Sequence, residues 1–205
     1  MAKIFSVSVR AGIDRVFDPI ARLLLRAHVS PDAVTVAGTV GVLVGAIGWA
    51  TRGQWVIATT IVTLSAFTDL IDGSMARQLG RAGRFGAFLD STMDRVADGA
   101  VFGSIAYYFA VQQRHSALVA ALICLVSGQL VSYVRARAEG LGLSAKVGIA
   151  ERAERLILIG VGGLATGFGW RYGLDVALWL LAVLSLVTIG QRIAHVYRQD
   201  RQAVR

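Results

Sequence analysis

Long apolar stretches without charge alternate with short charged segments along most of this chain. Six such stretches follow one another: residues 33–50, 53–68, 99–113, 116–134, 156–170 and, broken only by Asp175, 172–191. A helix needs about 20 apolar residues to cross a bilayer, so the shorter stretches span it only if their helices continue into the charged flanks. The pattern therefore predicts an all-α polytopic membrane protein with six transmembrane helices.

The first 29 residues carry a different pattern, in which basic and apolar residues alternate. Arg10, Arg15, Arg22 and Arg26 recur among apolar residues at spacings that give a helix one basic face and one apolar face. Because such a helix lies in the plane of the membrane surface, we expect an N-terminal interfacial amphipathic helix. A helix packed on the bundle is the alternative. We expect a single membrane domain over 1–205, with an arm at 1–29, a six-helix bundle at 30–198 and a tail at 199–205.

The distribution of charge predicts the orientation in the membrane. The 205 residues are 55% hydrophobic and carry a net charge of +8. With six spans, most of the basic residues fall on the side that holds both termini, and the positive-inside rule places that side in the cytoplasm. We therefore expect a multi-pass protein of the cell membrane. Topology and attraction to anionic lipid account for the net charge, so no nucleic-acid partner is expected.

Four aspartates adjoin the second and third predicted spans, at the cytoplasmic boundary: Asp69, Asp72, Asp90 and Asp94. Spacings of three and four residues place each pair on one face of its helix. A charge within a span costs about 2.5 to 3.5 kcal/mol, and four facing carboxylates repel one another, so divalent cations between them are the economical explanation. The segment contains no histidine or cysteine. Oxygen ligands alone favour Mg²⁺, with Mn²⁺ possible, and two ions suit carboxylate pairs on two helices.

The aspartates belong to a longer pattern. In full it reads Asp69-x-x-Asp72-Gly73-x-x-Ala76-Arg77, then eight residues, then Gly86-x-x-x-Asp90-x-x-x-Asp94. This pattern resembles the signature of the CDP-alcohol phosphotransferase family, and every fixed position is filled. Residues 30–35 are similar to the family's upstream Pro-Asn-x-x-Thr element, with Asp32 in the place of the usual Asn. The resemblance implies a membrane enzyme that uses a CDP-linked lipid.

The resemblance also implies roles for individual residues. Asp69, Asp72, Asp90 and Asp94 would be metal ligands, and Asp94 would in addition be the catalytic base that deprotonates the acceptor hydroxyl. The CDP-lipid would be bound by a second set: Pro31, Asp32, Thr35, Gly73, Ala76, Arg77 and Gly86. Small residues there leave room for the nucleotide, and an arginine fork suits pyrophosphate oxygens. The family further implies a homodimer.

The acceptor must be bound by residues outside the motif. Candidates for binding an acceptor phosphate are polar or basic residues predicted on the cytoplasmic side: Ser132, Arg135, Arg137, Arg152, Arg155 and Arg192. Ordinary positive-inside charge is the alternative explanation. Within the family the chain resembles most the actinobacterial phosphatidylinositol phosphate synthases, which implies CDP-diacylglycerol and inositol 1-phosphate as substrates. A phosphatidylglycerophosphate synthase, with glycerol 3-phosphate as acceptor, is the alternative within the family.

Three further features leave alternatives open. Asp98 extends the aspartate series by four residues, and we expect it to hydrogen-bond a polar neighbour or to support the site rather than to bind metal. Gly41-x-x-x-Gly45 permits close helix packing, either within one chain or between two. Intramembrane acids also mark cation transporters, which form a second functional class. The position of the acids beside a short cytoplasmic turn favours the enzyme.

Overall fold

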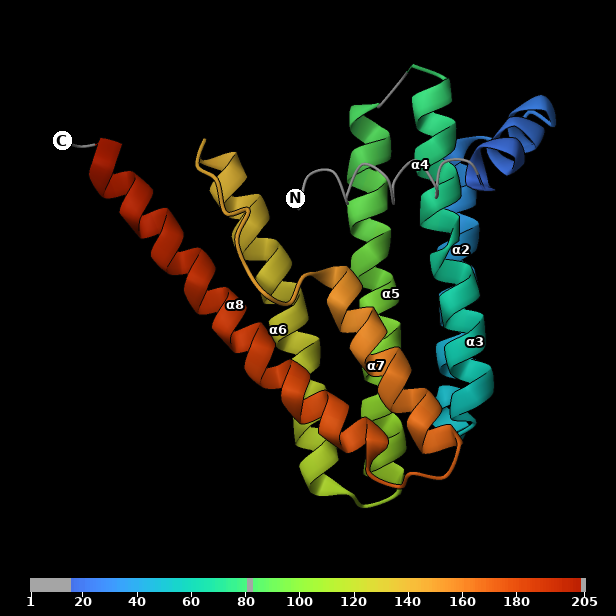
Figure 1. The fold of residues 1–205 in the computed structure, drawn as a ribbon, viewed down its shortest axis with the longest axis vertical. Helices are drawn as coiled ribbons and strands as arrows, with labels where there is room; N and C mark the ends of the chain where they lie inside the picture. Colours follow the sequence, from blue (N-terminus) through green and yellow to red (C-terminus); the bar gives the residue numbers. More distant parts are fainter. Residues whose placement is uncertain (1–15, 81–82, 204–205) are drawn as a thin grey trace. The chain divides into compact units, whose positions relative to one another are not determined.

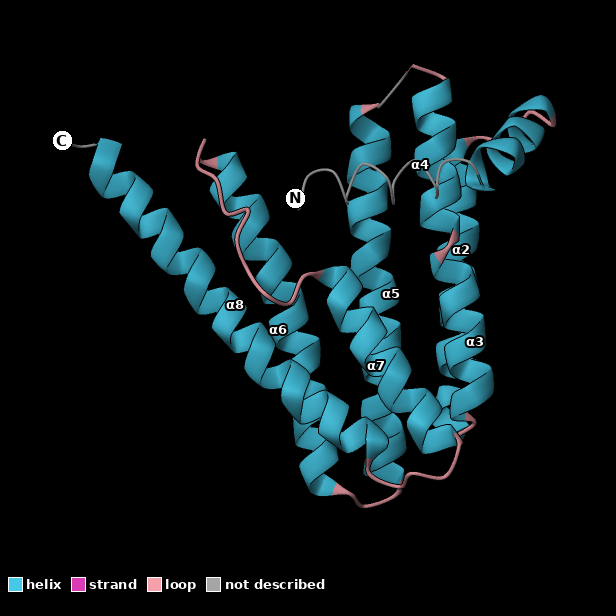
Figure 2. Ribbon diagram, viewed as in Figure 1, coloured by secondary structure: helices cyan, strands magenta, loops and turns pink. Residues whose placement is uncertain are grey.

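The computed structural model describes residues 16–80 and 83–203, and over these residues it contains helices and turns but no strand (Figures 1 and 2). Within the described residues, 16–26 are helical. The elements that follow are α2 (Pro31–Gly48), the 3₁₀ turn η1 (Ala50–Arg52), α3 (Trp55–Ala66), α4 (Thr68–Gln78), α5 (Arg84–Val111), α6 (His115–Gly140), α7 (Arg152–Gly167) and α8 (Gly173–Ala203). The all-α prediction is confirmed for the described part of the chain.

Within that part, four stretches are long and apolar enough to cross a membrane: Pro31–Arg52, Trp55–Gln78, His115–Gly140 and Gly173–Gln202. They coincide with the first, second, fourth and sixth predicted spans. The third and fifth correspond to α5 and α7. The first half of α5 carries the charged motif, and α7 has only 16 residues. The second and third predicted helices continue through their aspartates, as α4 and α5.

The outer surface of α2 is suited to lipid. Val36, Val40, Val44 and Ile47 follow one another at helical spacing and are 42 to 58% exposed. A continuous exposed apolar stripe of this kind is unfavourable in water and favourable against acyl chains. The exposed surface of α2 is thus typical of a membrane-spanning helix, as are its length and hydropathy.

The chain divides into two compact units, and the first comprises residues 16–45 and 60–97 of the described part. Here the small residues of α2 face α3. A Cβ atom at Gly45 would lie 2.9 Å from Ile61 Cγ2, and one at Gly41 would overlap the Ser65 side chain. The two glycines therefore allow close helix packing inside one chain.

The helix over residues 16–26 packs on α2 and α4. Ala21 is buried in a small core with Val34 and Met75. Ser74, fully buried on α4, donates a hydrogen bond from Oγ to Asp18 Oδ1 at 2.6 Å. The face of this helix that carries Asp18 and Ala21 is thus packed on the bundle, which was the alternative to an interfacial helix.

Another side of the same helix exposes an apolar stripe of Val16, Ile20 and Leu23. Arg22 and Arg26 are exposed as well, while Arg10 and Arg15 lie outside the described residues. Packing on the bundle therefore leaves an amphipathic surface that could rest on a membrane.

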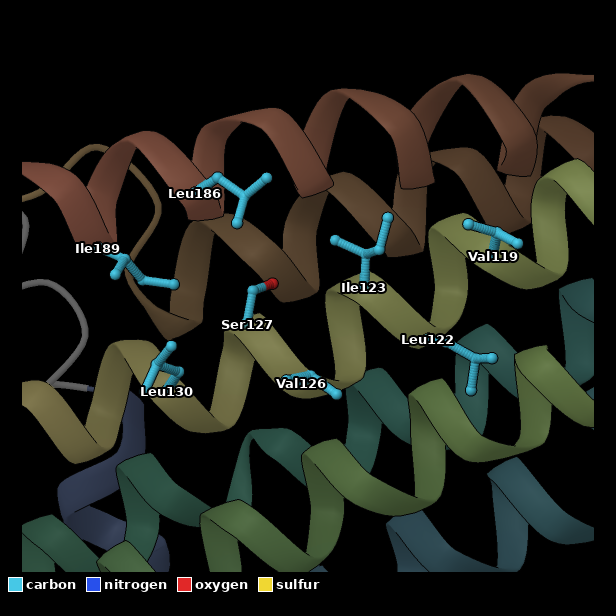
Figure 3. A pocket seen from close by; sticks show the side chains of 8 residues that line it. All are labelled: Val119, Leu122, Ile123, Val126, Ser127, Leu130, Leu186 and Ile189. Atoms are coloured by element: carbon cyan, nitrogen blue, oxygen red, sulfur yellow. The ribbon is translucent and has the colours of Figure 1, made fainter.

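The second unit comprises residues 46–59 and 98–203 of the described part. In it α8 packs along both α6 and α7 (Figure 1). Between α6 and α8 lies a groove of about 380 Å³, lined by apolar side chains such as Ile123, Leu130 and Leu186 together with Ser127 (Figure 3). The groove offers no charged group, so phosphate chemistry must be sought elsewhere.

Candidate functional site

Three of the four motif aspartates converge in the first unit. Asp69 and Asp72 lie on α4 and Asp90 on α5, and each offers a carboxylate oxygen that lies within 4.8 Å of the others'. Three carboxylates at this separation are unfavourable without a compensating cation. Their oxygens form the hard donor set that Mg²⁺ and Mn²⁺ prefer, so the residues present fit a divalent metal.

Asp72 is held in place by a residue from another helix. Its side chain is buried, and Thr35 on α2 donates a hydrogen bond from Oγ1 to Asp72 Oδ2 at 2.6 Å. A hydroxyl that binds one carboxylate oxygen fixes the direction of the other, which is how residues around a metal orient its ligands. Thr35, which the family resemblance assigns to the CDP-lipid pocket, thus contacts a candidate metal ligand.

Asp94 lies one turn beyond Asp90 on α5 and does not belong to the cluster of three. Its side chain is 19% exposed, and its Oδ2 is 3.7 Å from Nη2 of Arg95. A partly exposed carboxylate next to the cluster has one oxygen to offer a metal and another that can accept a proton. This geometry is compatible with a general base.

The small residues of the motif are near predicted CDP-lipid residues. A Cβ atom at Gly86 would lie 3.4 Å from Asp32 Oδ1, and one at Gly73 would lie 3.5 Å from Arg77 Nη1. The first turn of α2 is therefore close to the first turn of α5. Arg77 is exposed on the last turn of α4. Pro31 and Ala76 are half-buried in the same unit.

The candidate acceptor residues lie in the second unit, where two of them are buried. Arg192 donates hydrogen bonds to Val131 O at 2.5 Å and Val147 O at 2.8 Å, and its Nη2 lies 3.3 Å from Glu151 Oε1. Arg155 is 1% exposed and bonds to Asp98 and to a backbone carbonyl. Both guanidinium groups are therefore already engaged within the protein.

The other four candidates lie nearer the surface. Arg137 is exposed, and Arg135, also near the end of α6, pairs with Glu139 at 3.1 Å. Arg152 keeps 24% of its side chain exposed, with Nε 3.7 Å from Asp98 Oδ1. Ser132 is half-buried and donates to Gly128 O within its own helix at 3.4 Å. The six candidates thus divide into two buried arginines and four accessible residues.

The structure adds two polar residues that the motif does not contain. Asp98 does hydrogen-bond a polar neighbour, Arg155, as its position in the chain predicts. The contact of Asp18 with Ser74 has no counterpart in the sequence pattern, because the two residues are 56 positions apart. The only available signal was the presence of two acidic residues, Asp14 and Asp18, in a mostly basic and apolar segment.

Known proteins similar to this chain show the family to which it belongs. A family model described as CDP-alcohol phosphatidyltransferase matches residues 28–190. The phosphatidylinositol phosphate synthase of Streptomyces avermitilis is 48% identical over 202 residues, which cover 95% of this chain and 83% of that protein. The phosphatidylinositol phosphate synthase of Mycobacterium tuberculosis is 42% identical over 203 residues, covering 95% and 94% of the two chains.

Two solved structures of the Mycobacterium tuberculosis enzyme are similar as well. The crystal structure with CDP-DAG bound gives a TM-score of 0.86 at 42% identity, covering 89% of this chain and 94% of that one. The crystal structure in complex with manganese and citrate gives a TM-score of 0.86 at 41% identity, covering 88% of each.

Proposed function

We propose, because this chain belongs to the CDP-alcohol phosphatidyltransferase family, that it transfers the phosphatidyl group of CDP-diacylglycerol to inositol 1-phosphate and releases CMP. The observation that carries the proposal is the convergence of Asp69, Asp72 and Asp90 in a chain that is 48% identical to a phosphatidylinositol phosphate synthase. Three converging carboxylates suit the binding of a metal and, through it, of phosphates. The relative's structure with CDP-DAG bound supports the lipid substrate.

The motif residues divide the work of the reaction. Two divalent ions, Mg²⁺ or Mn²⁺, would neutralise the charge of the pyrophosphate when bound to Asp69, Asp72, Asp90 and Asp94. The relative that binds manganese supports a divalent ion of this kind. Arg77 binds pyrophosphate oxygens, while Gly73, Ala76 and Gly86 leave space for the nucleotide. Pro31, Asp32 and Thr35 complete that pocket, and Thr35 also orients Asp72.

The transfer itself exchanges one phosphorus–oxygen bond for another. Asp94 takes the proton from the acceptor hydroxyl, and that oxygen attacks the phosphorus attached to diacylglycerol. The bond between this phosphorus and the oxygen bridging to the cytidylate phosphate breaks, and CMP leaves with the electron pair. The new phosphodiester stays on the lipid.

The phosphate of the acceptor binds to the basic group of the second unit. Arg152, Arg135 and Arg137 present accessible guanidinium groups, and Ser132 adds a hydroxyl. Arg155 and Arg192 belong to the same group, but their guanidinium groups are buried and hydrogen-bonded within the protein. Arginine suits phosphate because its planar fork donates two parallel hydrogen bonds.

The deciding experiment measures CMP release by the purified full chain in detergent with CDP-diacylglycerol and Mg²⁺. Inositol 1-phosphate, glycerol 3-phosphate and free inositol are compared as acceptors, each with and without EDTA. We expect metal-dependent release that is fastest with inositol 1-phosphate. A preference for glycerol 3-phosphate would instead identify a phosphatidylglycerophosphate synthase. If no CMP were released with any acceptor, a cation transporter would become the better explanation of the aspartates.

We further propose that α5 and α7 complete a six-span bundle in a single membrane domain, with the motif on the cytoplasmic face and residues 16–26 at the surface of the cell membrane. A homodimer follows from the family resemblance. Cys124 is the only cysteine and is buried, so labelling of introduced cysteines has little background. In intact cells an impermeant thiol reagent is expected to label Gln113→Cys and to spare Gln202→Cys. Crosslinking of the purified protein tests the homodimer.

A further inference from the structure

Asp98 is a buried carboxylate in an apolar part of the second unit. It is 2% exposed, and its neighbours on α5, Val101 and Phe102, are buried hydrophobic residues. A carboxylate in such surroundings is stable in its charged form only when ionic partners replace the lost water. The ionic partners of Asp98 therefore indicate its role.

Two of the partners of Asp98 are arginines in the first turns of α7. Arg155 donates from Nη2 to Asp98 Oδ2 at 2.5 Å, and Arg152 brings Nε to 3.7 Å from Asp98 Oδ1. The arginines are three residues apart, which places them on one side of α7. Asp98 thus offers one carboxylate oxygen to each of two guanidinium groups.

Arg155 links this contact to a third helix. Its Nη1 donates to Gly128 O on α6 at 3.3 Å, so one guanidinium group connects α5, α6 and α7. Arg155 is almost fully buried, whereas Arg152 still reaches the surface. A buried arginine and a partly exposed one therefore contact the same carboxylate, that of Asp98.

The segment leading into α7 is fixed independently, by α8. Thr188 Oγ1 accepts hydrogen bonds from Ile149 N at 3.2 Å and Ala150 N at 3.0 Å. Arg192 holds Val147 O and Glu151 in the same segment. Because the backbone is held from α8, the contacts of Asp98 act on the directions of the two arginine side chains, and that of Arg155 is fixed together with Gly128 O.

We propose that Asp98 is a positioning residue for acceptor binding: it holds Arg152 and Arg155 in the orientation in which the first turn of α7 receives the acceptor's phosphate. This inference rests on the proposed function, in which that basic group binds the phosphate. Asp98 itself touches neither substrate. Its removal should weaken acceptor binding and leave the CDP-lipid unaffected.

The test compares Asp98→Asn with Asp175→Asn in the full-length protein. Asp175 forms a similar ion pair with Arg114, whose Nη2 lies 2.6 Å from Asp175 Oδ1, but neither residue belongs to the basic group. Kinetics of CMP release give the KM for inositol 1-phosphate and for CDP-diacylglycerol separately. We expect Asp98→Asn to raise the acceptor KM about tenfold or more, since a charge-assisted bond orients the arginines. The KM for CDP-diacylglycerol should stay within about twofold, and Asp175→Asn should leave both constants unchanged.

A second variant covers the case in which Asp98→Asn does not fold. In Asp98→Glu the two arginines keep an ionic partner, so no buried charge is left uncompensated, but the added methylene group displaces the carboxylate. The acceptor KM should again rise while the CDP-lipid KM does not. Equal changes in both KM values, or a lower melting temperature with an unchanged acceptor KM, would overturn the inference. Failure of the proposed function is distinguishable, because the unmodified protein would then release no CMP with inositol 1-phosphate.

Discussion

Thr35 Oγ1 lies 2.6 Å from Asp72 Oδ2, so α2 supplies the hydroxyl that orients a metal-binding carboxylate on α4. The bond is buried, and Thr35 is 7% exposed. Removing the hydroxyl would leave an unmatched carboxylate oxygen in the interior and free the carboxylate to turn. The affinity of the cluster for metal therefore depends on a residue that need not touch the ion.

Thr35→Val removes this hydroxyl and keeps the shape of the side chain. We expect it to weaken metal binding by about 10- to 100-fold, as is typical when a residue that orients a ligand is lost. The concentration of Mg²⁺ that gives half-maximal CMP release measures the effect. Thr35→Ser should restore most of the affinity. Thr39→Val is the matched control, because Thr39 Oγ1 donates to the Thr35 carbonyl of its own helix. A metal requirement that Thr35→Val does not alter would contradict the orienting role.

Asp94→Asn tests the general base. An amide cannot accept the acceptor's proton, so we expect kcat to fall about 100- to 10,000-fold. Because Asp69, Asp72 and Asp90 keep their carboxylates in this variant, thermal stabilisation by Mn²⁺ should be weakened but not abolished, whereas Asp72→Asn should abolish it. If Mn²⁺ stabilisation were abolished together with kcat, the loss of activity would be explained by lost metal binding. If kcat were unchanged, Asp94 would have no catalytic role.

The aspartate site could be predicted from the sequence because its information is local. Asp69 and Asp72 share one helical face, Asp90 follows across a short connection, and the motif that contains them resembles one family. The structure brings these three together, and the similar proteins confirm the family. Helical periodicity and the cost of charge in an apolar segment were sufficient for this part.

The contacts made by the basic residues could not be predicted in the same way. A count of arginines does not distinguish Arg155, which is buried against Asp98, from Arg137, which is exposed. The partners of Arg155 and Thr35 lie 57 and 37 positions away. Such pairs depend on which helices pack together, and hydrophobic periodicity does not carry that information. The same limit applies to α7, whose 16 residues fall short of a typical span.

Gly86→Ala tests the space reserved for the nucleotide. The added Cβ would lie at an ordinary contact distance of 3.4 Å from Asp32 Oδ1, so the protein should fold with a nearly unchanged melting temperature. The methyl group would occupy the space into which the CDP-lipid must fit, and we expect the KM for CDP-diacylglycerol to rise several-fold. Gly83→Ala, at an exposed position before the helix, is the control. If the two variants had equal KM values for CDP-diacylglycerol, the nucleotide would not bind next to Gly86.

Ser74→Ala tests how the N-terminal helix is held. Ser74 is fully buried, and its bond to Asp18 connects this helix to the motif helix α4. Loss of the hydroxyl leaves the Asp18 carboxylate without this donor, at a cost of about 1 to 3 kcal/mol. We expect a lower melting temperature and faster proteolysis within residues 16–26. Ser91→Ala should change neither, because Ser91 is exposed and bonds within its own helix. Unchanged proteolysis of Ser74→Ala would show that apolar contacts alone hold the helix.

Gly45→Val tests the packing of α2 on α3. A Cβ atom at this position would lie 2.9 Å from Ile61 Cγ2, closer than side chains normally approach, so the helices would have to separate. Overpacking of this kind costs about 1 to 3 kcal/mol and should lower the melting temperature in detergent. Gly48→Val, three residues further along α2, is the control, because no atom of another helix lies within 4 Å of its Cβ position among the described residues. If the glycines instead packed two chains together, Gly45→Val would abolish crosslinking of the dimer and leave the melting temperature of the monomer unchanged.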